Sequence, residues 1–84
     1  MKPVRLTAHA VEQCVERGAT EMEVREAIKR GVREPAKRGR FMYRLNFQYA
    51  AHWQDKFYAI KQVAPVAVEE QNEIVVITVY TFYF

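Results

Sequence analysis

The segment Thr7–Gly18, T-A-H-A-V-E-Q-C-V-E-R-G, has the spacing of an amphipathic helix, and the rest of the chain must pack around it. His9, Gln13 and Arg17 follow at intervals of four and form one polar row. The adjoining face, which we expect to point into a core, consists of Ala10, Val11, Cys14 and Val15. The row therefore lies at the border between core and solvent, where a side chain has a fixed position and access to a ligand. The simpler interpretation is that these three residues are ordinary half-exposed side chains of an amphipathic helix, without a function in binding or catalysis.

A second helix follows directly. Thr20 and Glu23 have the spacing of a capping box, in which each side chain binds a backbone N–H of the other residue. The apolar stripe of this helix repeats at i, i+3, i+4 and i+7 and consists of Val24, Ala27, Ile28 and Gly31. Thr7 is expected to cap the first helix, and Gly18 to end it. The short link between them predicts a helical hairpin.

Beyond the helices the hydrophobic period changes to two, which indicates strands. Apolar side chains occupy every second position from 41 to 49, and residues 50–53 continue this strand or belong to a second one. Residues 57–68 predict a strand that is interrupted or bulged at Pro65. Residues 74–84 are almost all β-branched or aromatic, which is typical of a central strand covered on both faces.

Two segments are less regular. Residues 2–7 predict a short edge strand or an extended lead-in, and residues 32–39, which contain Pro35, predict a loop or irregular edge. The sequence therefore predicts a single α+β domain over residues 1–84, in which an N-terminal helical hairpin packs on a three- to four-stranded, mostly antiparallel sheet. The apolar C-terminal end of the last strand should pack on the domain or on a second copy, as in a homodimer.

The composition narrows the classes of protein. The chain has 84 residues and no run of about 20 apolar residues, so we expect one domain that does not enter a membrane. The single cysteine fits a reducing compartment, and we expect a cytoplasmic protein. His9, Cys14 and His52 lack the spacing of zinc ligands, and no glycine-rich phosphate loop is present. We therefore predict no metal and no cofactor, and the absence of serine excludes a serine nucleophile.

Positive charge is concentrated between residues 29 and 44, where seven Lys or Arg residues face one Glu. A basic segment of this kind suits a polyanion such as nucleic acid, although a solvated loop would have the same composition. The candidate nucleic-acid-binding residues are Arg33, Lys37, Arg38, Arg40 and Arg44. Trp53 is a further candidate, since an aromatic ring near basic residues can stack on a base.

Several short motifs occur in a recognisable order. T-x-H-A begins at Thr7, the Arg17–Gly18 pair follows, a second helix opens over residues 20–28, and V-x-T-V-Y spans residues 76–80. Together they resemble a family of small prokaryotic domains of unknown function, related to the RelE/BrnT-like toxins of toxin–antitoxin pairs. That resemblance implies a RelE-like toxin fold and the activity of a metal-independent ribonuclease. The chain departs from the family at Gln13, where an arginine is usual.

RNA is cleaved when the ribose 2′-OH attacks the adjacent phosphorus. A protein assists by moving protons and by neutralising the charge of the transition state, and histidine with arginine or lysine suits these tasks. The candidate catalytic residues are His9 as general acid or base, Arg17 and Lys61 as phosphate ligands, and Tyr80 as a hydroxyl donor. His52 is a weaker candidate for a second acid or base.

Two interpretations stay open. The first is a toxin-like endoribonuclease that acts on RNA, free or on the ribosome, and is inhibited by a cognate antitoxin protein. The second is a binding module with the same fold, without catalysis, for a protein partner or nucleic acid. Gln13 favours the second because it lacks the charge and the forked donors of arginine. His9, Arg17 and the basic segment favour the first.

Overall fold

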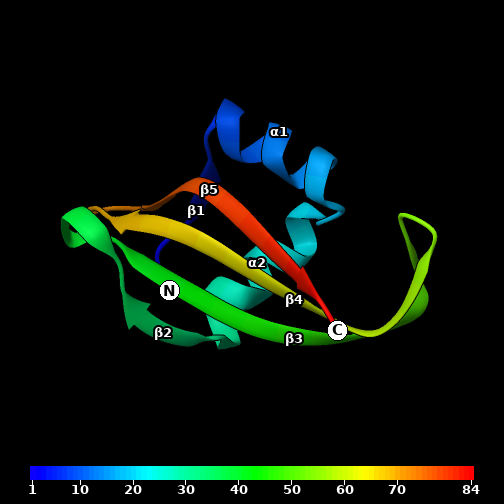
Figure 1. Ribbon diagram of the computed structural model, residues 1–84. Coiled ribbons are helices and arrows are strands. Elements are labelled where there is room, and N and C mark those ends of the chain that lie inside the picture. The colour runs from blue at the N-terminus through cyan, green and yellow to red at the C-terminus, as the bar shows by residue number, and fades with distance from the viewer.

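Both α-helices lie on one face of a mixed five-stranded sheet, and no α-helix covers the other face (Figure 1). The computed structural model describes residues 1–84. Its elements are β1 (Val4–Leu6), α1 (Ala8–Arg17), α2 (Glu21–Arg30), β2 (Val32–Pro35), the 3-10 turn η1 (Lys37–Gly39), β3 (Phe41–Trp53), β4 (Lys56–Glu69) and β5 (Ile74–Tyr83). The strand order is β1-β5-β4-β3-β2; β1 runs parallel to β5, and the other neighbours are antiparallel.

The predicted α+β class is confirmed, but the predicted number of strands is wrong. β1 is the short edge strand that was one of two alternatives for residues 2–7, and β2 forms the other edge. They contain only three and four residues, which is too short for a period of two to be recognised. The segment expected to be a loop or irregular edge thus begins with the edge strand β2. Pro35 is tolerated because it is the last residue of an edge strand. Such a strand has a neighbour on one side only, so the missing N–H interrupts no pairing with a second neighbour.

The helix ends follow the sequence signals. The Thr7 side chain caps α1 by accepting a hydrogen bond from the Ala10 N–H, and Gly18 ends the helix in the left-handed region at φ +77°. Thr20 and Glu23 form the expected capping box of α2. The two helices diverge in Figure 1, and each packs on the sheet. Neither α-helix is long and apolar enough to cross a membrane.

The core lies between the helices and the sheet. Its buried members are Ala10, Cys14, Val24, Ile28, Tyr43, Val63, Ala67, Ile74, Val76 and Val79. The prediction that Val11 and Val15 also face the core is wrong, and 78% of the surface of Val15 is exposed. The reason is that α1 contacts the sheet through its narrow Ala10–Cys14 row, and no element covers its outer side.

The β3–β4 hairpin is long and bent. β3 runs without interruption to Trp53, and its register with β4 shifts between Gln48 and Ala51. Gln54 and Asp55 form the turn, and both have positive φ, as in a type I′ hairpin. The tip curls towards the helices (Figure 1), so that the Trp53 ring contacts Gly18. In β4 the irregularity falls one residue after Pro65, between Val66 and Ala67.

β5 changes its surroundings along its length. Residues Ile74–Val76 lie between β1 and β4 and are buried, as predicted for a central strand. β1 stops at Leu6, so the rest of β5 has a strand on one side only, and α1 packs along the other. The prediction of burial on both faces is therefore wrong for the C-terminal half, where Tyr80 and Phe82 are exposed. We call the face without α-helices the open face.

Candidate functional site

Two of the four candidate catalytic residues meet at the edge of β5. Arg17, in the last turn of α1, donates a hydrogen bond from Nη1 to the Val79 carbonyl at 2.8 Å. Its guanidinium lies 4.8 Å from the centre of the Tyr80 ring, which is a cation–π contact. Arg17 thus occupies a carbonyl of an otherwise unpaired strand edge while its charge stays next to Tyr80.

Lys61 lies on the opposite, helix-covered face of the sheet. Only 5% of its surface is exposed. Its Nζ donates to the Gly18 carbonyl at 2.9 Å, forms an ion pair with Glu23 Oε1 at 2.9 Å, and lies 5.2 Å from the Tyr49 ring centre. The ammonium therefore joins the α1–α2 link and the start of α2 to the sheet.

His9 lies apart from the other three. It is exposed in the first turn of α1, and its side chain has no ion-pair partner. Arg17 is eight positions further along the chain, which corresponds to about 12 Å along a helix at 1.5 Å per residue. Between them, Gln13 donates from Nε2 to Glu16 at 3.4 Å, and its Oε1 has no partner. The structure thus brings Arg17 and Tyr80 together and leaves His9 and Lys61 at separate places.

The five candidate nucleic-acid-binding residues divide into two groups. Arg44 forms an ion pair with Glu34 at 2.6 Å, and Arg33 lies 3.7 Å from Glu69 and over the Phe41 ring. The other group has no carboxylate within ion-pair distance and consists of Lys37, Arg38 and Arg40. These three residues belong to η1 or follow it directly, so the unpaired charge is concentrated in one turn.

That turn borders a hollow on the open face of about 350 Å³, which is within the range of small-ligand sites. We call it the η1 hollow; it is lined by Ala36, Lys37, Arg40, Met42, Val66, Ile77, Thr78 and Tyr80. Cations, a hydroxyl group and an aromatic ring therefore surround a partly apolar floor. Cations and a hydroxyl group can bind phosphate, and an aromatic ring can stack on a base.

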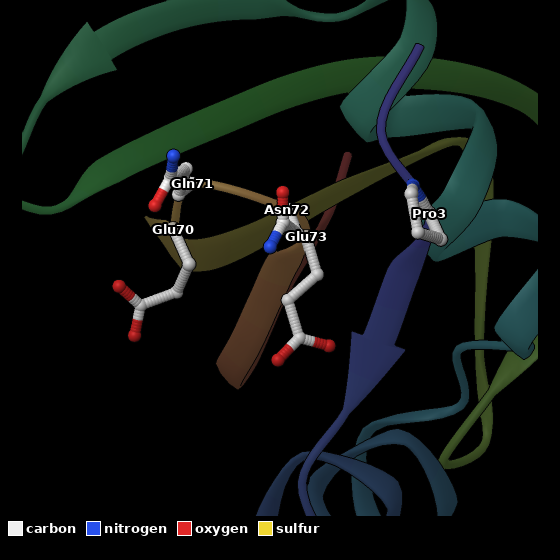
Figure 2. Close-up of a pocket in the computed structure, with 5 residues that line it drawn as sticks. All are labelled: Pro3, Glu70, Gln71, Asn72 and Glu73. Carbon is white, nitrogen blue, oxygen red and sulfur yellow. The ribbon is translucent and has the colours of Figure 1, made fainter.

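A second hollow, at the β4–β5 turn, has the opposite character (Figure 2). It is lined by Pro3, Glu70, Gln71, Asn72 and Glu73. Arg5 donates two hydrogen bonds of 3.1 Å to Glu73, and these bonds hold the pKa of that carboxyl below its ordinary value. The structure contains no group of three or more His, Cys, Asp or Glu side chains that could hold a metal ion. This acidic hollow is unsuited to a polyanion.

An aromatic cluster supports the Arg17 end of α1. The Trp53 and Tyr83 rings stack with centres 5.1 Å apart, and the Tyr49 and Tyr58 rings contact Tyr83 at 5.4 and 5.5 Å. Tyr83 Oη donates to the Arg17 carbonyl at 2.6 Å, and burial raises the pKa of Tyr83. Trp53 is thus engaged within the molecule. No sequence pattern pointed to Tyr83, because nothing in the spacing relates it to the helix end.

His52 lies near the tip of the hairpin. It is exposed, and its ring contacts Phe57 edge to face with centres 5.6 Å apart. It belongs to β3, whereas His9 is in the first turn of α1 and the η1 hollow lies beside η1. The structure gives His52 no contact with Arg17, Lys61 or Tyr80.

A comparison with models of known protein families places this chain. A family model described as a domain of unknown function, DUF4258, matches residues 6–81, a range that includes every candidate catalytic and nucleic-acid-binding residue named above. No curated protein and no solved structure matches the chain. Since the match covers almost the whole length, the chain belongs to the DUF4258 family.

Proposed function

We propose that this domain is a non-catalytic module that binds RNA at the η1 hollow. The observation that carries the proposal is the meeting of Lys37, Arg40 and Tyr80 around one hollow, with both cations lacking a carboxylate partner. A phosphate can take the place of the missing carboxylate, and releasing counterions from RNA favours that exchange. The Tyr80 ring offers a surface for a base.

The distribution of ion pairs supports this choice of place. Seven of the thirteen Lys and Arg side chains pair with carboxylates. A paired cation must give up its partner before it can neutralise a phosphate, whereas an unpaired one has no such cost. The η1 turn contributes three unpaired cations within four residues. RNA should therefore bind there in preference to the rest of the surface.

A RelE/BrnT-like, metal-independent endoribonuclease is the second candidate function. It is supported by the family resemblance, by the order of two helices before the antiparallel strands, and by His9, whose exposed ring has no partner. A general acid or base must come within about 3 Å of the proton it transfers. His9 is about 12 Å from Arg17 along α1, so cleavage would require the scissile phosphate to bind near His9 and not at Arg17.

Partner proteins follow from either function. For the binding module, a protein partner would compete with RNA by covering the η1 hollow. For the endoribonuclease, a cognate antitoxin would cover His9, and a ribosome would supply the RNA. A homodimer through the last strand would have to form where Arg17 already donates to the Val79 carbonyl. These partners are proposals that depend on the RNA-binding site.

The test measures the affinity for a fluorescently labelled RNA oligonucleotide by anisotropy, and cleavage of the same RNA on a gel with a chelator present. The Lys37→Ala/Arg40→Ala variant should bind at least about 10-fold more weakly, since each well-made contact to a charged group contributes about 1 kcal/mol or more. Lys29→Ala is the matched control, because Lys29 is also exposed and unpaired but lies on α2. Equal weakening by both variants would contradict a localised site.

His9→Ala separates the two candidate functions. The binding module predicts unchanged RNA affinity and no cleavage by either protein. Cleavage by the wild-type domain that is lost in His9→Ala, with the circular dichroism spectrum unchanged, would establish the ribonuclease instead.

A further inference from the structure

Three aromatic side chains form a row on the open face. Tyr80, Phe82 and Phe84 occupy every second position of the last strand, with 40%, 42% and 57% of their surfaces exposed. Phe84 stays in register because its N–H and C=O both bond to Ile60. We call these three residues the stacking row. The row starts at Tyr80, which also lines the η1 hollow.

Cations lie against two of the three rings. The Arg17 guanidinium is 4.8 Å from the Tyr80 ring centre, and the Arg44 guanidinium is 5.5 Å from the Phe82 ring centre. Arg44 also donates to Gln62 Oε1 at 2.9 Å. The rings are therefore flanked by positive charge and hydrogen-bonding side chains on an otherwise uncovered face.

The charge around the row decides which kind of partner fits it. Large exposed apolar groups in a row are typical of a binding surface. Arg44, which lies over the Phe82 ring, also pairs with the carboxylate of Glu34 and neutralises it. At the η1 end the row adjoins Lys37 and Arg40, which have no carboxylate partner. Aromatic rings continuous with unpaired cations suit a polyanion with flat bases better than a neutral or basic protein surface.

The spacing of the row decides between single and double strands. Side chains two positions apart on a strand are about 7 Å apart. This is about twice the 3.4 Å separation of stacked bases in a duplex, so the row matches a strand whose bases are unstacked from one another. Bases inside a duplex are covered by their neighbours and cannot stack on side chains.

We propose that the stacking row binds the bases of single-stranded RNA, whose phosphates bind at the η1 hollow, and that the domain selects single strands over duplexes. This inference rests on the proposed RNA-binding function. Tyr80 takes the first base beside the hollow, and Phe82 takes the next. Arg17 lies over the Tyr80 ring and Arg44 over the Phe82 ring, so that a base stacks on the side of each ring away from its arginine.

The test compares a single-stranded RNA with a hairpin duplex of matched sequence, by anisotropy, for the wild-type domain and for Phe82→Ala and Phe82→Leu. Wild type should bind the single strand at least about 5-fold more tightly, and both variants should lose most of that preference, because stacking contributes roughly 1–3 kcal/mol per base. Phe57→Ala is the control, because Phe57 is an aromatic residue with 55% exposure outside the row. It should leave both affinities unchanged, and melting curves should be alike for all variants.

Three results would overturn the inference, and they differ in what they leave standing. Equal binding of both RNAs that weakens only in Lys37→Ala/Arg40→Ala would remove the stacking row and retain the phosphate site. Absence of binding to either RNA would remove both proposals. A dimer of the wild-type domain, measured by light scattering, that Phe82→Ala dissociates would assign the row to self-association.

Discussion

Lys61 and Lys37 are the same residue type in opposite surroundings on one small domain. Lys61, on the helix-covered face, is buried, and its ammonium contacts a carbonyl, a carboxylate and an aromatic ring. Lys37 is exposed beside the open face and has no carboxylate partner. A lysine in the sequence can therefore have either role. A lysine whose charge is paired within the protein stabilises the fold, whereas a lysine without a partner is available to a ligand.

The largest effect should come from removing Lys61. Lys61→Ala removes the ammonium from the Gly18 carbonyl and from the Glu23 carboxylate, which keeps only its bond from the Thr20 N–H, and breaking a buried ion pair costs about 3 kcal/mol. Urea denaturation should show this loss. Lys56→Ala, which removes an exposed lysine at the hairpin, should change the free energy of unfolding by less than about 0.5 kcal/mol.

The RNA affinity of Lys61→Ala tests the same comparison between Lys61 and Lys37. If Lys61→Ala lost RNA affinity at unchanged stability, Lys61 would contact phosphate, as the sequence proposed. The account predicts the reverse: stability falls, and the folded fraction retains its affinity.

The next largest effect should come from Gly18, which connects the two helices under the aromatic cluster. Gly18→Ala is strained at φ +77° and places a Cβ 2.6 Å from the Trp53 ring and from Tyr83 Oη. Gly39→Ala is strained in the same way at φ +72°, but nothing lies within 4 Å of its Cβ. Gly39→Ala should cost about 1 kcal/mol, and Gly18→Ala clearly more.

The two glycine variants together isolate the aromatic contact. Equal losses of stability in thermal denaturation would mean that the Trp53–Tyr83 stack moves away freely. The cluster would then not fix the end of α1, and the position of Arg17 would depend on its contacts with β5, to Val79, Tyr80 and Thr81.

The smallest effect should be a loss of folding stability at alkaline pH that comes from Tyr83, on the helix-covered face. Burial raises the pKa of Tyr83 above its ordinary value of about 10. A folded-state pKa that is raised means that the native state holds its proton longer than the unfolded state does. Stability is therefore fully present below pH 10 and falls as the pH rises through the folded-state pKa. Tyr83→Phe should flatten that fall, and a decline of equal slope in both proteins would assign it to other groups.

Local sequence signals predicted the helices well, because their causes are local. The caps at Thr7 and Thr20 act within three residues, and the glycine at position 18 needs only its own φ. β1 was expected only as one of two alternatives, and β2 only as a loop or irregular edge. Three or four residues are too few to show a period of two, and the pairing of both strands depends on distant partners. The exposure of Val15 could not be predicted either, since it depends on how much of α1 the sheet covers.

The candidate site was predictable in its residue types but not in its assembly. The basic segment and Tyr80 were both singled out, yet about 40 residues separate them, and the strand order brings them to one hollow. The pairing of Arg44 with Glu34 depends on the register of β2 and β3, and that of Lys61 with Glu23 on the placement of α2. The sequence therefore identified the charged residues. Which of them are neutralised depends on the strand register and on the placement of α2.

The most direct test of this account is the salt dependence of RNA affinity. The slope of log K against log salt concentration counts the phosphates that the protein neutralises. For Lys37→Ala/Arg40→Ala the account predicts a slope smaller in magnitude by about 1–2 than that of the wild type, at unchanged stability, whereas Lys29→Ala keeps the wild-type slope. A slope unchanged in the double variant would contradict the claim that the unpaired cations of the η1 hollow bind RNA.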